Sequence, residues 1–257
     1  MLWYQKGIAE VDMDILKPER PRGWGMPRLT WYLETLWANT IATFANKHET
    51  HRLCRIDDVM FDIAMEWKGG SPNRQTIVPL MMFFRSHSAF RAAAALGMGG
   101  ATVEGLAVLR LSLEFCGYAA LITQKPALAK TWWDRDIGAE EQKLARRSFQ
   151  HGPVVAAIEK YQPKLAIIYD ELYNRVIQFG AHPNEKSITA NLKLDVRPEQ
   201  TRLDQVYLQA DGIALDHWLR TASQVGITLL KVFGYVHQGR YAEIKVEDRI
   251  KMLSEGL

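Results

Sequence analysis

Apolar residues recur at spacings of three to five over most of this chain, a period typical of amphipathic helices. In the segment that starts at Thr30, for example, the pattern is carried by Leu33, Trp37, Ile41 and Phe44. Glycine and proline interrupt the pattern repeatedly and set the expected ends of the helices. We therefore predict helices over residues 30–44, 56–67, 76 or 80 to 96, 101–123, 139–150, 154–161, 163–180 and 213–236.

A different period appears once, over residues 188–196. Ile188, Leu192 and Val196 belong to an alternation of apolar and polar residues with period two, which predicts a strand. The short apolar run 206–208 follows after a polar loop and could pair with it. The sequence thus predicts a mainly all-α protein, an antiparallel helical bundle with one small β-hairpin near 188–208.

The first 28 residues lack a helical period, and Pro18, Pro21 and Gly23 interrupt regular structure there. We expect an irregular N-terminal arm over 1–28, followed by one helical-bundle domain over 29–257 with the hairpin inserted in it. No internal repeat and no long linker divides the chain further.

Composition narrows the class of protein. The chain has 257 residues, of which 47% are hydrophobic, and its 8 Trp exclude a disordered polymer. The two cysteines, Cys54 and Cys116, cannot form a disulfide framework and are typical of a reducing, cytoplasmic compartment. A net charge of +3 permits an acidic partner without requiring one.

The N-terminus has no basic region followed by an apolar run, so no secretory signal is expected. Residues 101–123 are long and apolar enough to span a bilayer, but Glu104, Arg110 and Glu114 interrupt them. Charges at the centre of a span cost roughly 2.5–3.5 kcal/mol each, so we expect a buried bundle helix and no membrane contact.

Three polar residues, Arg110, Glu114 and Tyr118, lie four apart on that apolar helix. This spacing places them on one stripe, and charges buried in a bundle must be paired or hydrated. One interpretation is a structural Arg110–Glu114 pair. The other is a polar binding pocket in the bundle core.

A second set of candidates surrounds the end of the helix that begins at Pro163. His182 and Asn184 follow this helix, and Tyr173 and Arg175 precede its end. A histidine in such a loop can carry a proton near neutral pH. The alternative is a turn in which His182 or Asn184 caps neighbouring backbone groups.

Other candidates are weaker. His87 shares a helix face with Phe84 and Phe90, so it is either a hydrogen-bonded core histidine or part of a site. Trp132 and Trp133, next to Arg135, either form a stacking platform for a base or pack under a connection.

Two further patterns concern metal and phosphate chemistry. His48, His51 and Cys54 have a metal-like spacing that matches no motif with a known mechanism, and a solvated helix end is the alternative. The glycines at 97–100 lack the spacing of a phosphate-binding loop. We therefore predict no cofactor and no metal.

Residues 84–88, the stripe from Arg110 to Tyr118, and residues 180–184 together resemble uncharacterised bacterial all-helical proteins. These proteins are similar to HEPN-type helical bundles, a group with metal-independent ribonucleases and nucleotide- or RNA-binding defence proteins. The resemblance covers about 100 central residues. In that group an Arg, four to six residues and a His form the ribonuclease signature, which acts on the RNA backbone across a dimer interface.

Two pairs in this chain have that spacing: Arg175 with His182, and Arg146 with His151. The first pair departs from the family pattern, because a glycine lies between its members and Val176 replaces the polar residue that follows the arginine.

Three hypotheses about function follow. The first is a binding module for a nucleic acid, a nucleotide or a protein partner, as a monomer or a homodimer, in a bacterial stress or defence setting. The second is a HEPN-like ribonuclease, with His182 as acid or base and Arg175 stabilising the phosphate charge. The third is an enzyme acting on a small molecule, in which Arg110, Glu114, Tyr118 and His182 surround one pocket.

Overall fold

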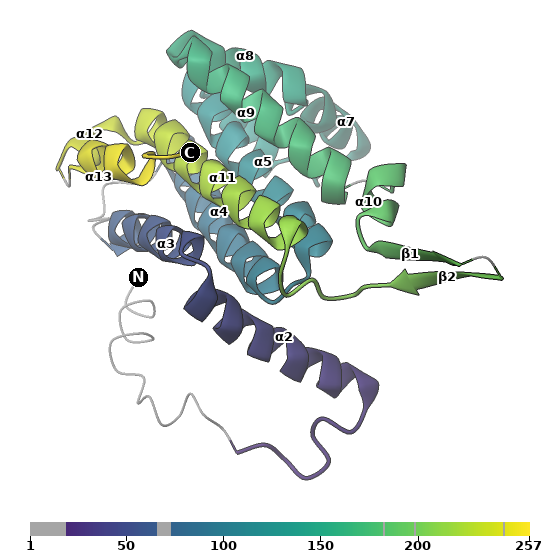
Figure 1. The fold of residues 1–257 in the computed structure, drawn as a ribbon. Coiled ribbons are helices and arrows are strands. Elements are labelled where there is room, and N and C mark those ends of the chain that lie inside the picture. Colours follow the sequence, from purple (N-terminus) through teal and green to yellow (C-terminus); the bar gives the residue numbers. More distant parts are fainter. Residues whose placement is uncertain (1–18, 66–72, 182, 198, 244) are drawn as a thin grey trace.

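The structure, a computed structural model, describes residues 19–65, 73–181, 183–197, 199–243 and 245–257. Within these ranges it contains twelve α-helices, one π-helical turn and a single antiparallel sheet of two strands (Figure 1). The predicted fold class, a mainly all-α bundle with one small hairpin, is therefore confirmed.

The centre of the bundle is α5 (Thr102–Gln124), which contacts α4 (Arg74–Met98), α11 (Ile213–Val236), α8 (His151–Tyr161) and α9 (Pro163–Val176). Because α5 is apolar nearly all round, neighbouring helices can cover it on several sides without burying many polar side chains. Figure 1 shows α4, α5 and α11 running side by side, with α8 and α9 above them.

Glycine allows these helices to approach closely at two crossings. A Cβ atom on Gly105 of α5 would lie 2.6 Å from the Nε1 atom of Trp218 on α11. A Cβ atom on Gly117 would overlap Val154 of α8 and the hydroxyl of Tyr169 on α9. The large side chains of the neighbouring helices therefore occupy the space that a side chain on α5 would need.

Among the described residues, α5 is also the one helix that is long and apolar enough to cross a membrane, with a mean hydropathy of 1.5. However, 61% of the residues in its most apolar window are buried inside the bundle. This burial agrees with the predicted buried bundle helix.

The N-terminal helices lie on the other side of α4 and α11. Residues 19–27 form turns, and residues 1–18 of the predicted arm lie outside the described residues. Helix α2 (Arg28–Asn46) extends away from the bundle and α3 (Glu49–Met65) packs on α11 (Figure 1). Helix α3 begins seven residues before the predicted start. The prediction missed its first two turns because they contain few apolar residues.

The connection from α5 to α8 contains two short helices, α6 (Leu128–Trp133) and α7 (Ala139–Ser148). The predicted helices over 139–150 and 154–161 are confirmed as α7 and α8. Trp132 and Trp133 end α6, and Trp133 is 45% exposed.

The strand prediction is wrong over its first four residues. Ile188 lies in α10 (Glu185–Thr189) instead, because the side chain of Asn184 caps this helix. After a π-helical turn, η1 (Ile177–Ala181), and α10, the chain forms β1 (Leu192–Arg197) and β2 (Gln200–Gln205). The partner of β1 is therefore β2, and not the predicted run 206–208.

The register of the hairpin explains this difference. Arg197 pairs with Gln200 and Leu194 pairs with Leu203, so the turn is two residues long. The two leucines face each other across the strands and are both more than 60% exposed.

The long C-terminal helix, α11, has the predicted bounds. Two short helices, α12 (Gln238–Glu243) and α13 (Val246–Leu253), follow it and were not predicted. Lys245, which directly precedes α13, has a φ of 50°, in the left-handed region.

Candidate functional site

The polar stripe of α5 forms a hydrogen-bonded network with α9. The Nε atom of Arg110 donates to Oε1 of Glu114 at 2.8 Å, and the hydroxyl of Tyr173 donates to the same oxygen at 3.0 Å. The guanidinium of Arg110 also lies over the ring of Tyr173, 5.8 Å from its centroid. The Arg110–Glu114 pair is therefore not closed on itself, since Tyr173 joins it from the neighbouring helix.

A second pair adjoins this network through the same tyrosine. The Nε2 atom of His151, the first residue of α8, lies 2.6 Å from Oδ1 of Asp170 on α9. The ring of His151 stacks on the ring of Tyr173 with 4.0 Å between centroids. Asn174 also donates to Asp170, at 3.2 Å, which fixes the orientation of the carboxylate.

The third residue of the stripe, Tyr118, lies at the edge of a pocket of about 370 Å³ between α5, α6 and α7. Tyr118 packs against Phe149 with 5.0 Å between ring centroids, and Arg135 lies 5.4 Å from the ring centroid of Trp132. The pocket is lined by Tyr118, Trp132, Arg135, Asp136, Gln142, Ala145, Arg146 and Phe149.

Burial and the nearby Glu114 carboxylate raise the pKa of Tyr118 to about 12. The same two causes raise the pKa of Tyr173. Both hydroxyls are therefore protonated at neutral pH and can donate hydrogen bonds. The pocket thus combines aromatic faces, two arginines and a neutral hydroxyl.

Arg175, a member of the predicted catalytic pair, does not line this pocket. Arg175 follows Tyr173 by two residues, which places it on the opposite side of α9. It forms an ion pair with Glu171 and donates to Oε1 of Gln224 on α11 at 2.7 Å. His182 lies outside the described residues.

Gly180, near the end of the π-helical turn, packs on α5, where an added Cβ would lie 2.5 Å from the carbonyl oxygen of Val103. Asn184 accepts a hydrogen bond from the backbone of Ser187 at 3.0 Å and caps α10. These contacts of Asn184 agree with the alternative interpretation, in which Asn184 caps neighbouring backbone groups and is not part of a site.

His87 lies elsewhere, on the side of α4 that faces α3. It is 3% exposed, and its Nε2 atom lies 2.6 Å from Oδ1 of Asp57. Arg91, one turn further along α4, binds both oxygens of Asp57, at 2.7 and 2.8 Å. Burial by itself raises the pKa of Asp57, but the hydrogen bonds from His87 and Arg91 outweigh it and lower the pKa to about 2. These contacts are those of a hydrogen-bonded core histidine.

The residues with metal-like spacing lie at the start of α3. The rings of His48 and His51 meet edge to face, 5.8 Å apart, and Cys54 is exposed. Across the described ranges, no group of three or more His, Cys, Asp or Glu side chains has a geometry that could hold a metal ion.

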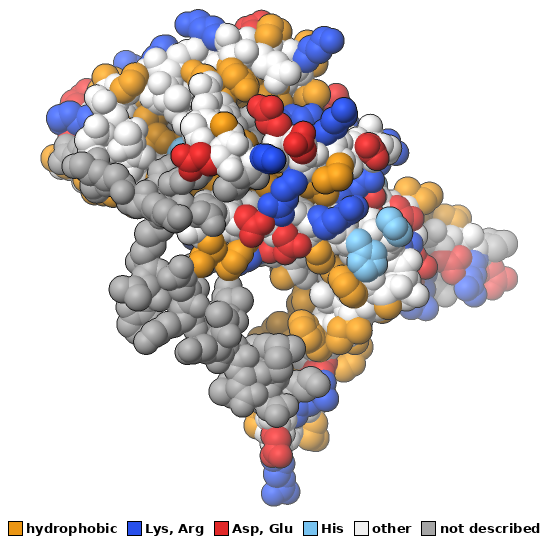
Figure 2. All heavy atoms as spheres, turned by 90° about the vertical axis from the view of Figure 1, so that its left-hand side faces the viewer, with side chains coloured by type: hydrophobic (Ala, Val, Ile, Leu, Met, Phe, Trp, Pro, Cys, Tyr) orange, Lys and Arg blue, Asp and Glu red, His pale blue; other side chains and the backbone are white. Residues whose placement is uncertain are grey.

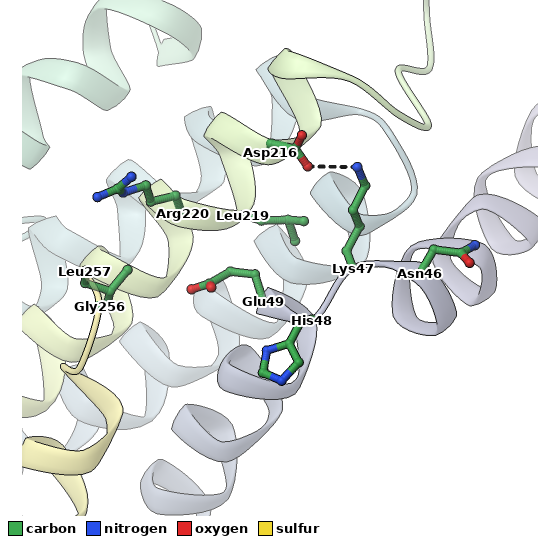
Figure 3. A pocket seen from close by; sticks show the side chains of 9 residues that line it. All are labelled: Asn46, Lys47, His48, Glu49, Asp216, Leu219, Arg220, Gly256 and Leu257. Atoms are coloured by element: carbon green, nitrogen blue, oxygen red, sulfur yellow. Dashed lines mark ion pairs between the residues drawn. The ribbon is translucent and has the colours of Figure 1, made fainter.

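A different pocket, of about 300 Å³, lies beside His48 where the α2–α3 junction meets α11 and the C-terminal residues (Figure 3). Lys47 closes one side of it through ion pairs with Asp216, at 2.9 Å, and Asp211, at 2.6 Å. Arg220 and Glu49 lie on the other side. Opposite charges alternate around this pocket and compensate one another, so it favours no one class of charged ligand.

Sequence reasoning did not connect two acidic residues, Asp170 and Asp57, with the histidines that they bind. Each lies on a different helix from its histidine, so spacing along the chain does not connect them. A signal existed in both cases: Asp170 and Tyr173 are three apart on α9, and His87 and Arg91 are four apart on α4. Each spacing places two polar groups on one helix face, where they need a partner.

Comparisons with models of protein families, with curated proteins and with solved structures found no match to this chain.

Proposed function

We propose that this protein is a binding module for a nucleotide, held in the pocket between α5, α6 and α7. The observation that carries the proposal is the combination of Trp132 and Tyr118 with Arg135 and Arg146 in one pocket of about 370 Å³. Pockets for small ligands have volumes of roughly 300–1,000 Å³ and combine apolar walls with a few polar groups.

Each part of a nucleotide has a counterpart there. Aromatic faces stack on any base, and arginine guanidinium groups bind phosphate oxygens in pairs of hydrogen bonds. The hydroxyl of Tyr118, which stays protonated up to high pH, is available to a sugar or phosphate oxygen. On the face shown in Figure 2, by contrast, basic and acidic side chains are interspersed, which does not favour the binding of a long polyanion there.

The test is a calorimetric titration of the full chain with AMP, ATP and GTP. Arg146→Ala should weaken binding about 10-fold or more, because a hydrogen bond to a charged group contributes roughly 1.5–3 kcal/mol. Arg147→Ala is the matched control, since Arg147 is exposed on the same helix and does not line the pocket.

A second pair of variants tests the aromatic contact. Trp132→Ala should weaken binding, whereas Trp133→Ala, one residue away and outside the pocket, should not. The proposal fails if none of the three nucleotides binds at millimolar concentration. It also fails if each pocket variant behaves like its control.

Ribonuclease activity is a second candidate, favoured by the contact between His151 and Asp170. A carboxylate 2.6 Å from the imidazole orients the ring, as in a general acid or base. His151 is only partly buried, and four residues separate it from Arg146, which lines the pocket. This is the second of the two pairs that fit the HEPN-type signature.

Cleavage of a fluorescent single-stranded RNA in the presence of EDTA tests this candidate. If His151 is the acid or base, His151→Ala abolishes cleavage and His48→Ala, at an exposed histidine, leaves it unchanged. His182→Ala, measured in parallel, tests the pair with Arg175. Cleavage that survives both His151→Ala and His182→Ala excludes a ribonuclease built on either histidine.

A further inference from the structure

Helix α2 carries an apolar stripe that no described element covers. Its five members recur at spacings of four, four, four and three residues, so they lie within about 120° on one side of the helix. They are between 42% and 68% exposed. The stripe consists of Leu29, Leu33, Trp37, Ile41 and Phe44.

The adjacent side of α2 is fixed to the bundle, which holds the stripe in place. The hydroxyl of Thr43 donates to the carbonyl of Met98 at 2.8 Å, and Asn39 donates to the carbonyl of Gly99 at 3.1 Å. Both acceptors lie at the C-terminal end of α4. Figure 1 shows α2 extending from this attachment away from the other helices. The stripe is therefore presented outwards on an anchored helix.

The exposed area is what a dimer interface requires. With roughly 200 Å² for a fully accessible large apolar residue, the five exposed fractions amount to about 550 Å². A standard interface buries about 800 Å² on each partner, of which 56–65% is apolar. The stripe alone therefore supplies about the whole apolar part of such an interface.

The order of the residues in the stripe suits a second copy of the same helix. Trp37 is the middle residue of α2, which spans Arg28–Asn46. In an antiparallel pair centred on Trp37, Leu33 of one copy faces Ile41 of the other, and Leu29 faces Ala45, next to Phe44. Each residue then meets an apolar residue, as a two-fold interface demands. Residues 35–46 contain no charged side chain, so two copies do not repel each other there.

We propose that this stripe is the dimer interface of the protein, and that α2 packs antiparallel against α2 of a second copy with Trp37 at the two-fold axis. This interface is independent of the nucleotide pocket, because no residue of α2 lines that pocket.

Sedimentation velocity of the full chain between about 1 and 100 µM tests the proposal. The expected species has twice the 29.3 kDa mass of one chain. Trp37→Glu should raise the dissociation constant at least about 100-fold, because it places two like charges next to each other at the axis. Circular dichroism of the variant checks that the helices are retained.

The matched control is Trp31→Glu. Trp31 is 62% exposed, similar to the 60% of Trp37, but it lies about 120° further round α2 and outside the stripe. This variant should remain a dimer. An equimolar mixture of Trp37→Glu and Trp37→Lys chains should recover the dimer at low salt, since opposite charges then meet at the axis.

A wild-type chain that stays monomeric at 100 µM overturns the proposal. So does a dimer that persists in Trp37→Glu, or one that is lost equally in Trp31→Glu.

Discussion

Replacing Asp57 by asparagine tests how much the cluster of Asp57, His87 and Arg91 contributes to stability. Asparagine keeps the shape of the side chain and removes its charge, so Arg91 loses its paired carboxylate. The carboxylate is 28% exposed in the folded protein, which limits screening by solvent. The cluster joins α3 to α4, so its loss affects the packing of two core helices.

The magnitude follows from the pKa of Asp57, which falls from 3.8 to about 2 on folding. Each pKa unit corresponds to about 1.4 kcal/mol, so the charged form adds about 2 kcal/mol to the free energy of unfolding at pH 7. A carboxyl group whose pKa is lowered by folding stabilises the protein above its unfolded pKa. This contribution is therefore complete above about pH 4 and is lost as the pH falls towards 2.

Urea denaturation followed by tryptophan fluorescence measures the effect. At pH 7, the free energy of unfolding of Asp57→Asn should be about 2 kcal/mol lower than that of the wild type. This difference should shrink between pH 4 and pH 2. Asp62→Asn is the control, because Asp62 also lies on α3 but forms a more exposed ion pair, with Arg249. Exposed pairs contribute about 0–1 kcal/mol. A difference that does not change with pH, or that equals the effect of Asp62→Asn, would refute the reasoning.

Two further predictions concern packing and pH. Gly117→Ala should lower the free energy of unfolding by about 1–3 kcal/mol, because its Cβ would overlap the buried Tyr169. Gly152→Ala, at a helical position where the Cβ meets nothing within 4 Å, should instead raise it by about 0.4–1 kcal/mol; equal effects in chemical denaturation would contradict this. Burial lowers the pKa of His237 to about 4, so unfolding, in which its pKa returns to 6.5, takes up a proton below neutral pH. Stability should therefore decrease as the pH falls from 6.5 to 4, and His237→Phe should lose this part of the pH dependence in thermal unfolding.

The helices were predicted well where the helical spacing of apolar residues is continuous and no other pattern overlaps it. Helix α11 is the best example, because its period is continuous and Gly212 precedes it. The strand prediction was wrong at Ile188 because alternation alone does not detect the capping of a helix by Asn184. The partner strand was misplaced because the turn sets the register, and β2 has few apolar residues to indicate it.

The candidate site was predictable only within one helix. The spacing of Arg110 and Glu114 placed them on one face, and the structure has them in contact. Tyr173, which binds the same carboxylate, comes from a helix 59 residues further on. The contact between His151 and Asp170 likewise depends on how α8 and α9 pack, which no local pattern describes.

The central position of α5 has a consequence for synthesis of the chain on the ribosome. Helix α5 ends at Gln124, and α11, which covers it, begins only at Ile213. At a translation rate of about 5–20 residues per second, roughly 5–20 s pass between the synthesis of α5 and the synthesis of α11. Helix α4 is already present at that point and α8 and α9 follow during this interval, so the side of α5 that α11 covers is the one that stays exposed longest. Efficient production of this protein should therefore depend on chaperones that bind nascent apolar segments.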